Sequence, residues 1–165
     1  MAENIRIIGV TKEEKYSSLL PQIKALVEGE KDLTANLANI SSAVKYAMNF
    51  FWVGFYIVKK GELVLGPFQG PVACTRIAIG KGVCGMAWKN KETIIVENVE
   101  DFPGHISCNS LSKSEIVLPI FDKDKNVIAV LDIDDDKLAT FNNTDKTFLS
   151  DIISEVETLF QLNIN

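Results

Sequence analysis

Residues 127–134, Val-Ile-Ala-Val-Leu-Asp-Ile-Asp, form the stretch that decides the fold. Positions 127–131 are apolar on both alternating faces, which is typical of a central strand covered on both sides of its sheet. Asp132 and Asp134 are expected to end this strand, and alternation places both side chains on the face of Val130. Because an unpartnered buried carboxylate is costly, Asp132 is expected to meet a partner or a ligand.

Three helices are predicted, two before the sheet and one after it. The first starts at a capping box formed by Thr11 and Glu14, and apolar residues then recur at helical intervals. The last can be capped by Asn142 or Thr144 and has one long apolar face. The three helices are expected over about 12–28, 33–49 and 145–161.

The middle of the chain is rich in β-branched and aromatic residues and is expected to form the sheet, beginning with a hairpin around Lys60-Gly61. This order of elements predicts one α+β domain over 1–165, with a central, mostly antiparallel sheet, helices packed on one side and a loop-covered pocket on the other. A long polar loop over 97–114 suggests that the pocket has a function. Besides 127–131, the expected strands are 50–58, 63–65, 75–79, 93–96 and 116–121.

The composition excludes several classes of partner. The net charge is −5, and no basic cluster is denser than the Lys59-Lys60 pair, so neither nucleic acid nor an anionic membrane is expected as a partner. No apolar run approaches the roughly 20 residues of a membrane span, and the first residues lack the pattern of a secretory signal. A cytoplasmic location is therefore expected.

Three cysteines, Cys74, Cys84 and Cys108, lie close in sequence to the only histidine, His105. In a reducing compartment they are candidates for a thiol redox site, a metal site or three buried inert thiols. Structural zinc sites usually bring their ligands in close pairs, whereas nine residues separate Cys74 from Cys84. His105 and Cys108 alone resemble half of such a site, so no metal is expected, and His105 stays a loop residue of open role.

The segment Gly80-Lys81-Gly82-Val83-Cys84-Gly85 formally matches the dinucleotide-binding pattern G-x-G-x-x-G. The helix predicted after it is too short for a βαβ crossover, so we interpret the segment as a turn whose glycines permit close packing of the backbone. The same turn could direct backbone N–H groups at Cys84 and lower the pKa of its thiol.

Carboxylates and aromatic rings surround this region in the predicted sheet. Glu115 precedes one strand, and Asp132 and Asp134 follow another, so these acids could hold an ammonium group or supply a proton. Trp52 and Tyr56 lie on one face of the first strand, with a glycine between them. They are expected either in the core or as the wall of an apolar pocket.

Six short motifs follow one another within residues 12–160. They contain one of the cysteines, the histidine, the three candidate acids and the two aromatic residues of the first strand. They are Trp52-Val53-Gly54-Phe55-Tyr56, Leu65-Gly66-Pro67-Phe68-Gln69-Gly70, Gly82-Val83-Cys84-Gly85, Gly104-His105-Ile106, Ser114-Glu115-Ile116-Val117 and Leu131-Asp132-Ile133-Asp134. Together with the cysteines they resemble the free methionine-(R)-sulfoxide reductases, which are single GAF domains. The resemblance implies a GAF-like fold and a cytoplasmic oxidoreductase that reduces free methionine-(R)-sulfoxide, without a cofactor, with electrons from thioredoxin.

The resemblance also implies roles for individual residues. Cys108 would be the attacking thiol or its partner, and Cys84 and Cys74 would be the recycling thiols. The substrate-binding acids would be Glu115, Asp132 and Asp134, and the aromatic wall would contain Trp52 and Tyr56. The chain departs from the family pattern at Asn109, where Asp is usual, at Leu111, where a small residue is usual, and at Asp135, where Ser is common.

Thiol chemistry gives such a site a consistent reaction sequence. A thiolate attacks the sulfoxide sulfur, an acid protonates the departing oxygen, and the resulting sulfenic acid condenses with a second thiol to form a disulfide. Thioredoxin would then reduce that disulfide by exchange. The alternative is a GAF-type module that binds a small ligand, or senses redox state, without turnover. The pair of amino-terminal helices could also support a homodimer.

Overall fold

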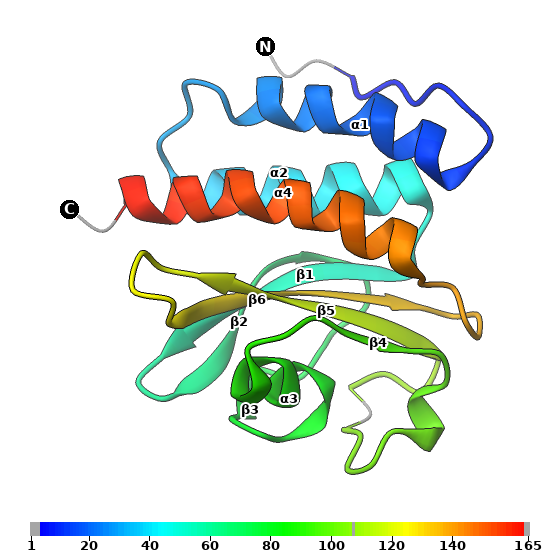
Figure 1. The fold of residues 1–165 in the computed structure, drawn as a ribbon, viewed down its shortest axis with the longest axis vertical. Coiled ribbons are helices and arrows are strands. Elements are labelled where there is room, and N and C mark those ends of the chain that lie inside the picture. The colour runs from blue at the N-terminus through cyan, green and yellow to red at the C-terminus, as the bar shows by residue number, and fades with distance from the viewer. Residues whose placement is uncertain (1–3, 107, 164–165) are drawn as a thin grey trace.

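The computed structural model describes residues 4–106 and 108–163. A six-stranded sheet lies between two layers, with three long helices on one face and a short helix and several loops on the other (Figure 1). Within the described residues, no helix combines the length and the hydropathy that crossing a membrane requires. The predicted α+β arrangement, with long helices on one side only, is confirmed.

The three long helices begin and end close to their expected positions. They are α1 (Lys12–Val27), α2 (Leu33–Met48) and α4 (Asn143–Leu162). The capping box at Thr11 and Glu14 is present, and Asn142 rather than Thr144 caps α4. Each cap supplies an acceptor to backbone N–H groups that have no partner inside the helix, which is why these residues mark the helix starts.

The sheet has the strand order β3-β2-β1-β6-β5-β4, and every neighbouring pair is antiparallel. β6 lies between β1 and β5, as its apolar sequence predicts for a central strand. The strands are β1 (Trp52–Lys59), β2 (Glu62–Gln69), β3 (Arg76–Ala78), β4 (Ile94–Val96), β5 (Ser114–Phe121) and β6 (Val127–Asp135).

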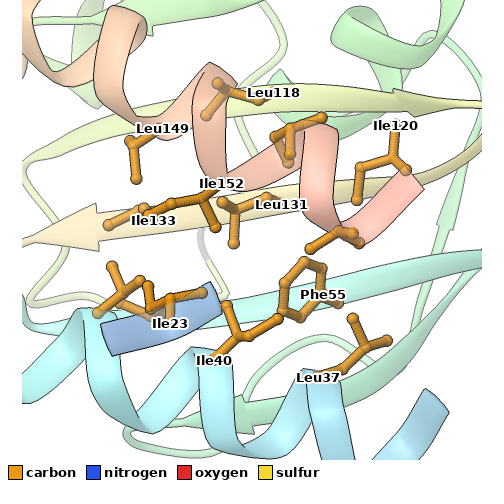
Figure 2. Packing of buried hydrophobic residues seen from close by; sticks show 14 of the residues in the cluster. Ile23, Leu37, Ile40, Phe55, Leu118, Ile120, Leu131, Ile133, Leu149 and Ile152 are labelled. Carbon is orange, nitrogen blue, oxygen red and sulfur yellow. The ribbon is translucent and has the colours of Figure 1, made fainter. Parts of the chain in front are cut away.

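The larger core lies between the sheet and the three long helices (Figure 2). In this core, apolar side chains of the helices pack against apolar side chains of the strands. Side chains alternate along β6, so Leu131 and Ile133 point into this core and Val130 points to the opposite face of the sheet. Central strands buried on both faces give the site a rigid base. The side chains labelled in Figure 2 are Ile23, Leu37, Ile40, Phe55, Leu118, Ile120, Leu131, Ile133, Leu149 and Ile152.

Two strands extend beyond their predicted ends. β6 continues through Asp135, because Ser114 of β5 pairs with Asp135, so Asp132 and Asp134 lie within the ladder rather than after it. β2 continues past Leu65 to Gln69, although Pro67 was expected to open a loop. A register shift between Gly54 and Tyr56 of the neighbouring strand accommodates this part of β2.

The short helix α3 (Gly82–Asn90) is the helix predicted after the Gly80–Gly85 segment, but it begins within that segment. Its first turn contains Gly82 and Gly85, two of the three glycines of the Gly80–Gly85 segment. A Cβ atom at Gly85 would lie 2.4 Å from the carbonyl oxygen of Ala78, so only glycine allows this close approach of helix and strand. The interpretation of these glycines as packing residues is consistent with that contact. The loop after β4 contains one turn of 3-10 helix, η1 (Val99–Asp101).

Candidate active site

A pocket lies on the face of the sheet that carries α3 and the loops. Its walls come from β1, β3, β5, β6 and α3 and from the segments 72–73, 105–106 and 108–112. Seven of the eight predicted site residues line it, and the eighth, Cys74, is joined to one of them. The seven are Trp52, Tyr56, Cys84, Cys108, Glu115, Asp132 and Asp134.

Stacked aromatic rings form one wall of the pocket. The indole of Trp52 lies between the rings of Tyr56 and Phe68, with ring centroids 6.1 and 5.3 Å away. Its Nε1 donates a hydrogen bond of 3.0 Å to the carbonyl oxygen of Pro71. The ring is therefore held by stacking and by a directional bond, which fixes a rigid apolar surface.

Three carboxylates form the base of the pocket. Glu115 on β5 pairs with Asp134 on β6, and Asp132 lies two residues before Asp134 on the same face of the sheet. Glu115 and Asp132 are each only 6% exposed. Oδ1 of Asp132 is buried and has no hydrogen-bond partner in the part of the chain that the structure describes. Such an atom is the expected contact for a cationic or proton-donating ligand.

Burial raises the pKa of all three carboxyl groups. For Glu115 and Asp132, loss of solvation is the main cause and repulsion from the neighbouring carboxylates adds to it, so the pKa of each lies well above the usual range. Burial raises the pKa of Asp134 to about 6, although the Ser112 hydroxyl donates a hydrogen bond to its carboxylate and opposes the shift. At neutral pH the cluster therefore retains protons that ordinary carboxyl groups would have lost.

Cys84 lies directly against this acidic cluster. It belongs to the first turn of α3, is 3% exposed, and its thiol donates a weak hydrogen bond to Oε1 of Glu115 at 3.9 Å. Burial and the three carboxylates raise the pKa of the Cys84 thiol well above its usual range. The expectation that the helix start would lower this pKa is wrong, because desolvation and three nearby acids outweigh the few N–H groups of the first turn.

The other two cysteines form a disulfide, Cys74–Cys108, with their Cα atoms 5.2 Å apart. Cys108 lines the pocket, while Cys74 lies behind the lining in the loop after β2. The hydroxyl of Tyr56 donates a hydrogen bond of 3.0 Å to the carbonyl oxygen of Cys74. One cysteine of the pair thus faces any bound molecule, and the other is held beside it by a pocket residue.

Comparison with known proteins places this site in a family. A model described as GAF domain matches residues 31–161. The chain is 57% identical to GAF domain-containing protein A of Dictyostelium discoideum, over 93% of this chain and 97% of that protein. It is 43% identical to the free methionine-R-sulfoxide reductase of Saccharomyces cerevisiae, over 85% of this chain and 82% of that enzyme.

A solved structure agrees with both sequence matches. The free methionine-R-sulfoxide reductase of Neisseria meningitidis, in complex with its substrate, superposes with a TM-score of 0.94 at 46% identity and covers 96% of each chain. The chain belongs to the free methionine-R-sulfoxide reductase family of GAF domains. The predicted family and its GAF fold are confirmed.

Within this free methionine-R-sulfoxide reductase fold, His105 also lines the pocket. It lies near Cys108 in the loop before β5, and partial burial lowers the pKa of its imidazole, which favours the neutral ring. The half zinc site that His105 and Cys108 resemble in the sequence cannot form in the oxidised protein, because the sulfur of Cys108 is bonded to Cys74. The remaining contribution of His105 is to the shape of the pocket.

Sequence reasoning did not single out Ser112 as a site residue. Ser112 is buried and its hydroxyl donates to Asp134, 22 residues away along the chain. Asn109 and Ile106 also line the pocket, and the side chain of Asn109 accepts a hydrogen bond from the backbone of Leu111. These residues lie in the long loop whose functional role was predicted, so its length was the signal that could have found them.

Asp135, one of the departures from the family pattern, has a structural role in this free methionine-R-sulfoxide reductase fold. It is 2% exposed, and its carboxylate accepts hydrogen bonds from the backbone of Lys137 and the hydroxyl of Thr140. The side chain points to the face opposite Asp134 and is covered, and its carboxylate caps the turn that follows β6.

Proposed function

We propose that this protein reduces free methionine-R-sulfoxide to methionine with its own thiols, without a bound cofactor. The observation that supports this most directly is the Cys74–Cys108 disulfide, because one of its sulfurs lines the pocket that holds the buried acids. A disulfide in this position is the product expected after one turnover. The proposed substrate is that of the similar free methionine-R-sulfoxide reductases of Saccharomyces cerevisiae and Neisseria meningitidis.

Cys108 is the proposed attacking thiol in the reduced protein. It faces the pocket, whereas the buried Cys84 is a poor nucleophile because its thiol holds its proton tightly. The Cys108 sulfur bonds to the sulfoxide sulfur as the oxygen is protonated. The sulfoxide S–O bond then breaks, the oxygen bonds to the Cys108 sulfur, and the bond between the two sulfurs breaks. Cys108 is oxidised to a sulfenic acid that carries the oxygen, and methionine is released with its sulfur reduced by two electrons.

The acidic cluster supplies the proton and binds the substrate's ammonium group. Glu115 and Asp132 retain a proton at neutral pH because burial and mutual repulsion raise their pKa, so one carboxyl can donate to the sulfoxide oxygen. Among the described residues, Asp132 Oδ1 has no hydrogen-bond partner, and it is the proposed acceptor for an ammonium N–H. Trp52 and Tyr56 would pack against the methyl sulfinyl end.

Cys74 is the proposed resolving thiol. Its sulfur attacks the Cys108 sulfenic acid, the disulfide forms and water leaves, which balances the oxygen taken from the substrate. A dithiol protein of the thioredoxin class then exchanges with the disulfide and is itself oxidised. Such recycling needs a reducing compartment, which supports the cytoplasmic assignment.

The experiment is a coupled assay with thioredoxin, its reductase and NADPH, in which the two sulfoxide epimers are offered free and within a peptide. We expect turnover with the free R epimer alone. Binding of that epimer without NADPH consumption would instead favour the ligand-binding or redox-sensor module. In the same assay Cys108→Ser should abolish turnover, while Cys84→Ser, the matched control, should retain a Cys108-dependent reaction.

Peptide mapping identifies the resolving thiol. The reduced protein receives one equivalent of substrate in the absence of thioredoxin, and its cysteines are then mapped by mass spectrometry. We expect the Cys74–Cys108 pair and a free Cys84. A Cys84–Cys108 pair would move the resolving role to Cys84, and three free thiols after methionine release would remove the disulfide step.

A further inference from the structure

The proposed redox cycle uses two cysteines and leaves Cys84 without a role. This thiol comes from α3, Glu115 from β5 and Asp132 from β6, and each offers one ligand atom such that the three atoms lie within 4.8 Å of one another. All three residues are buried. The tertiary structure therefore concentrates one thiol and two carboxylates at a single point on the base of the pocket.

A second observation indicates that this point lacks a ligand. Oδ1 of Asp132 is buried and unpartnered among the described residues, and Asp132 as a whole is 6% exposed. Three groups that are negative when ionised repel one another there, which burial makes more severe. A cation that contacts all three would remove both the unpartnered atom and the repulsion.

We propose that Cys84, Glu115 and Asp132 bind a thiophilic divalent metal ion, best matched by Zn²⁺, in the space that the amino-acid substrate would occupy. One sulfur and two carboxylate oxygens are a ligand set that Zn²⁺ accepts, and water in the pocket would complete four-coordination. Zn–S and Zn–O bond lengths place tetrahedral ligand atoms about 3.4–3.6 Å apart. The Cys84 sulfur and Glu115 Oε1 are already 3.9 Å apart.

Binding involves proton release and no electron transfer. The Cys84 S–H bond breaks, its sulfur bonds to the metal, and any protons held by the two carboxyl groups pass to water. The sequence predicted no metal because the cysteines and His105 do not occur in close pairs along the chain, and the three carboxylates were interpreted only as substrate-binding or proton-donating acids. This metal site does not depend on the proposed reductase activity. Bound Zn²⁺ would reversibly block the binding of any small molecule that enters the pocket.

The test uses the oxidised protein, in which the Cys74–Cys108 disulfide leaves Cys84 as the free thiol. Co²⁺ is added as a spectroscopic probe for the site, and Zn²⁺ binding is measured by calorimetry. We expect one ion per chain and a thiolate-to-cobalt charge-transfer band, and Zn²⁺ should bleach that band. Cys84→Ser should abolish the band and weaken Zn²⁺ binding by about tenfold or more, as expected for loss of a ligand.

Two further variants keep the proposal testable if Cys84→Ser does not fold. Glu115→Gln and Asp132→Asn keep the thiol and the side-chain size, and each should weaken Zn²⁺ binding by about tenfold. Asp136→Asn, an exposed acid at the end of β6, is the matched control and should bind like the wild type. Absence of a cobalt band in the wild type, or unchanged Zn²⁺ affinity in both Glu115→Gln and Asp132→Asn, would overturn the proposal.

Competition with substrate is measured separately, because it rests on the proposed function. Free methionine-R-sulfoxide, added to the oxidised protein, should lower the apparent affinity for Co²⁺ in proportion to its concentration. If the cobalt band forms but the sulfoxide leaves it unchanged, the metal site stands and its overlap with the substrate site is refuted. The two failures are therefore distinguishable.

Discussion

At the scale of single residues, the chemistry of the site follows from burial. Asp132 has a buried oxygen with no hydrogen-bond partner in the described part of the chain, and Cys84 has a thiol beside three carboxylates. Both would be costly in a purely structural core, since buried polar groups are normally satisfied. Their cost is explained if the pocket holds a ligand that carries positive charge or donates hydrogen bonds.

The first prediction concerns Asp132. Asp132→Asn removes a carboxyl group that would ionise beside the substrate ammonium and hold it, and keeps the size of the side chain. A hydrogen bond to a charged group contributes about 1.5–3 kcal/mol, so KM for the free R epimer should rise roughly 10–100-fold. Steady-state kinetics measures this, and Asp136→Asn is the control. An unchanged KM would return Asp132 to a structural role.

The second prediction concerns Tyr56, whose hydroxyl donates to the carbonyl oxygen of Cys74. Tyr56→Phe keeps the ring of the pocket wall but frees the loop that carries the resolving thiol. Loss of about 1 kcal/mol should slow disulfide formation about fivefold in a single turnover, with methionine release less affected. Rapid quench and thiol trapping measure the two steps. Tyr46→Phe, an exposed residue, is the control, and equal slowing of both steps would contradict the prediction.

At the scale of elements, β1 shapes the pocket through a residue that has no side chain. A Cβ atom at Gly54 would lie 2.4 Å from Cβ of Phe68 and 2.4 Å from the indole of Trp52. The stacked wall therefore needs glycine at this position of the strand. This is a packing requirement rather than a conformational one.

The third prediction follows from this contact. Gly54→Ala should displace the indole, lower the free energy of unfolding by about 1–3 kcal/mol and raise KM. Ile57→Val on the same strand changes the opposite face and should lower stability without altering KM. Urea unfolding and steady-state kinetics on both variants separate the two effects. If both variants change KM equally, the wall does not depend on Gly54.

At the scale of the whole molecule, the acidic cluster makes stability depend on pH. The pKa of Asp134 is about 6 in the folded protein and near its ordinary value of 3.8 when unfolded. The folded state therefore binds more protons between these values. Stability is highest below pH 4 with respect to this group and falls as the pH rises through about 6.

The fourth prediction is that Asp134→Asn reduces this fall. Asparagine can still accept the hydrogen bond from Ser112 but cannot ionise. At pH 7.5 the variant should be more stable than the wild type by on the order of 1–3 kcal/mol, while at pH 4 the difference should largely vanish. Urea unfolding at both values tests this. Titrating groups remote from Asp134 cancel in the difference, and relief of repulsion in the acidic cluster acts in the same direction, so a variant less stable than the wild type at pH 7.5 would contradict the assignment.

The same arrangement explains how much of the molecule was predictable. The apolar run at 127–131 identified the central strand, and the caps at Thr11 and Asn142 located helix starts. These signals could be recognised because each depends only on residues that are close together in the sequence. The ends of β2 and β6 were mispredicted, since both are set by pairing with residues on neighbouring strands. Local patterns contain no information about those partners.

Some properties of the candidate site could likewise be predicted from the sequence, and others could not. The sequence by itself determined the family and the residue types of the site, because ordered motifs keep their chemistry along the chain. Only the tertiary structure decided that Cys74 rather than Cys84 is bonded to Cys108, that Ser112 contacts Asp134, and that the thiol of Cys84 is protonated rather than activated. Those outcomes depend on distance and burial, and in this fold both arise from contacts between segments that are far apart in the sequence.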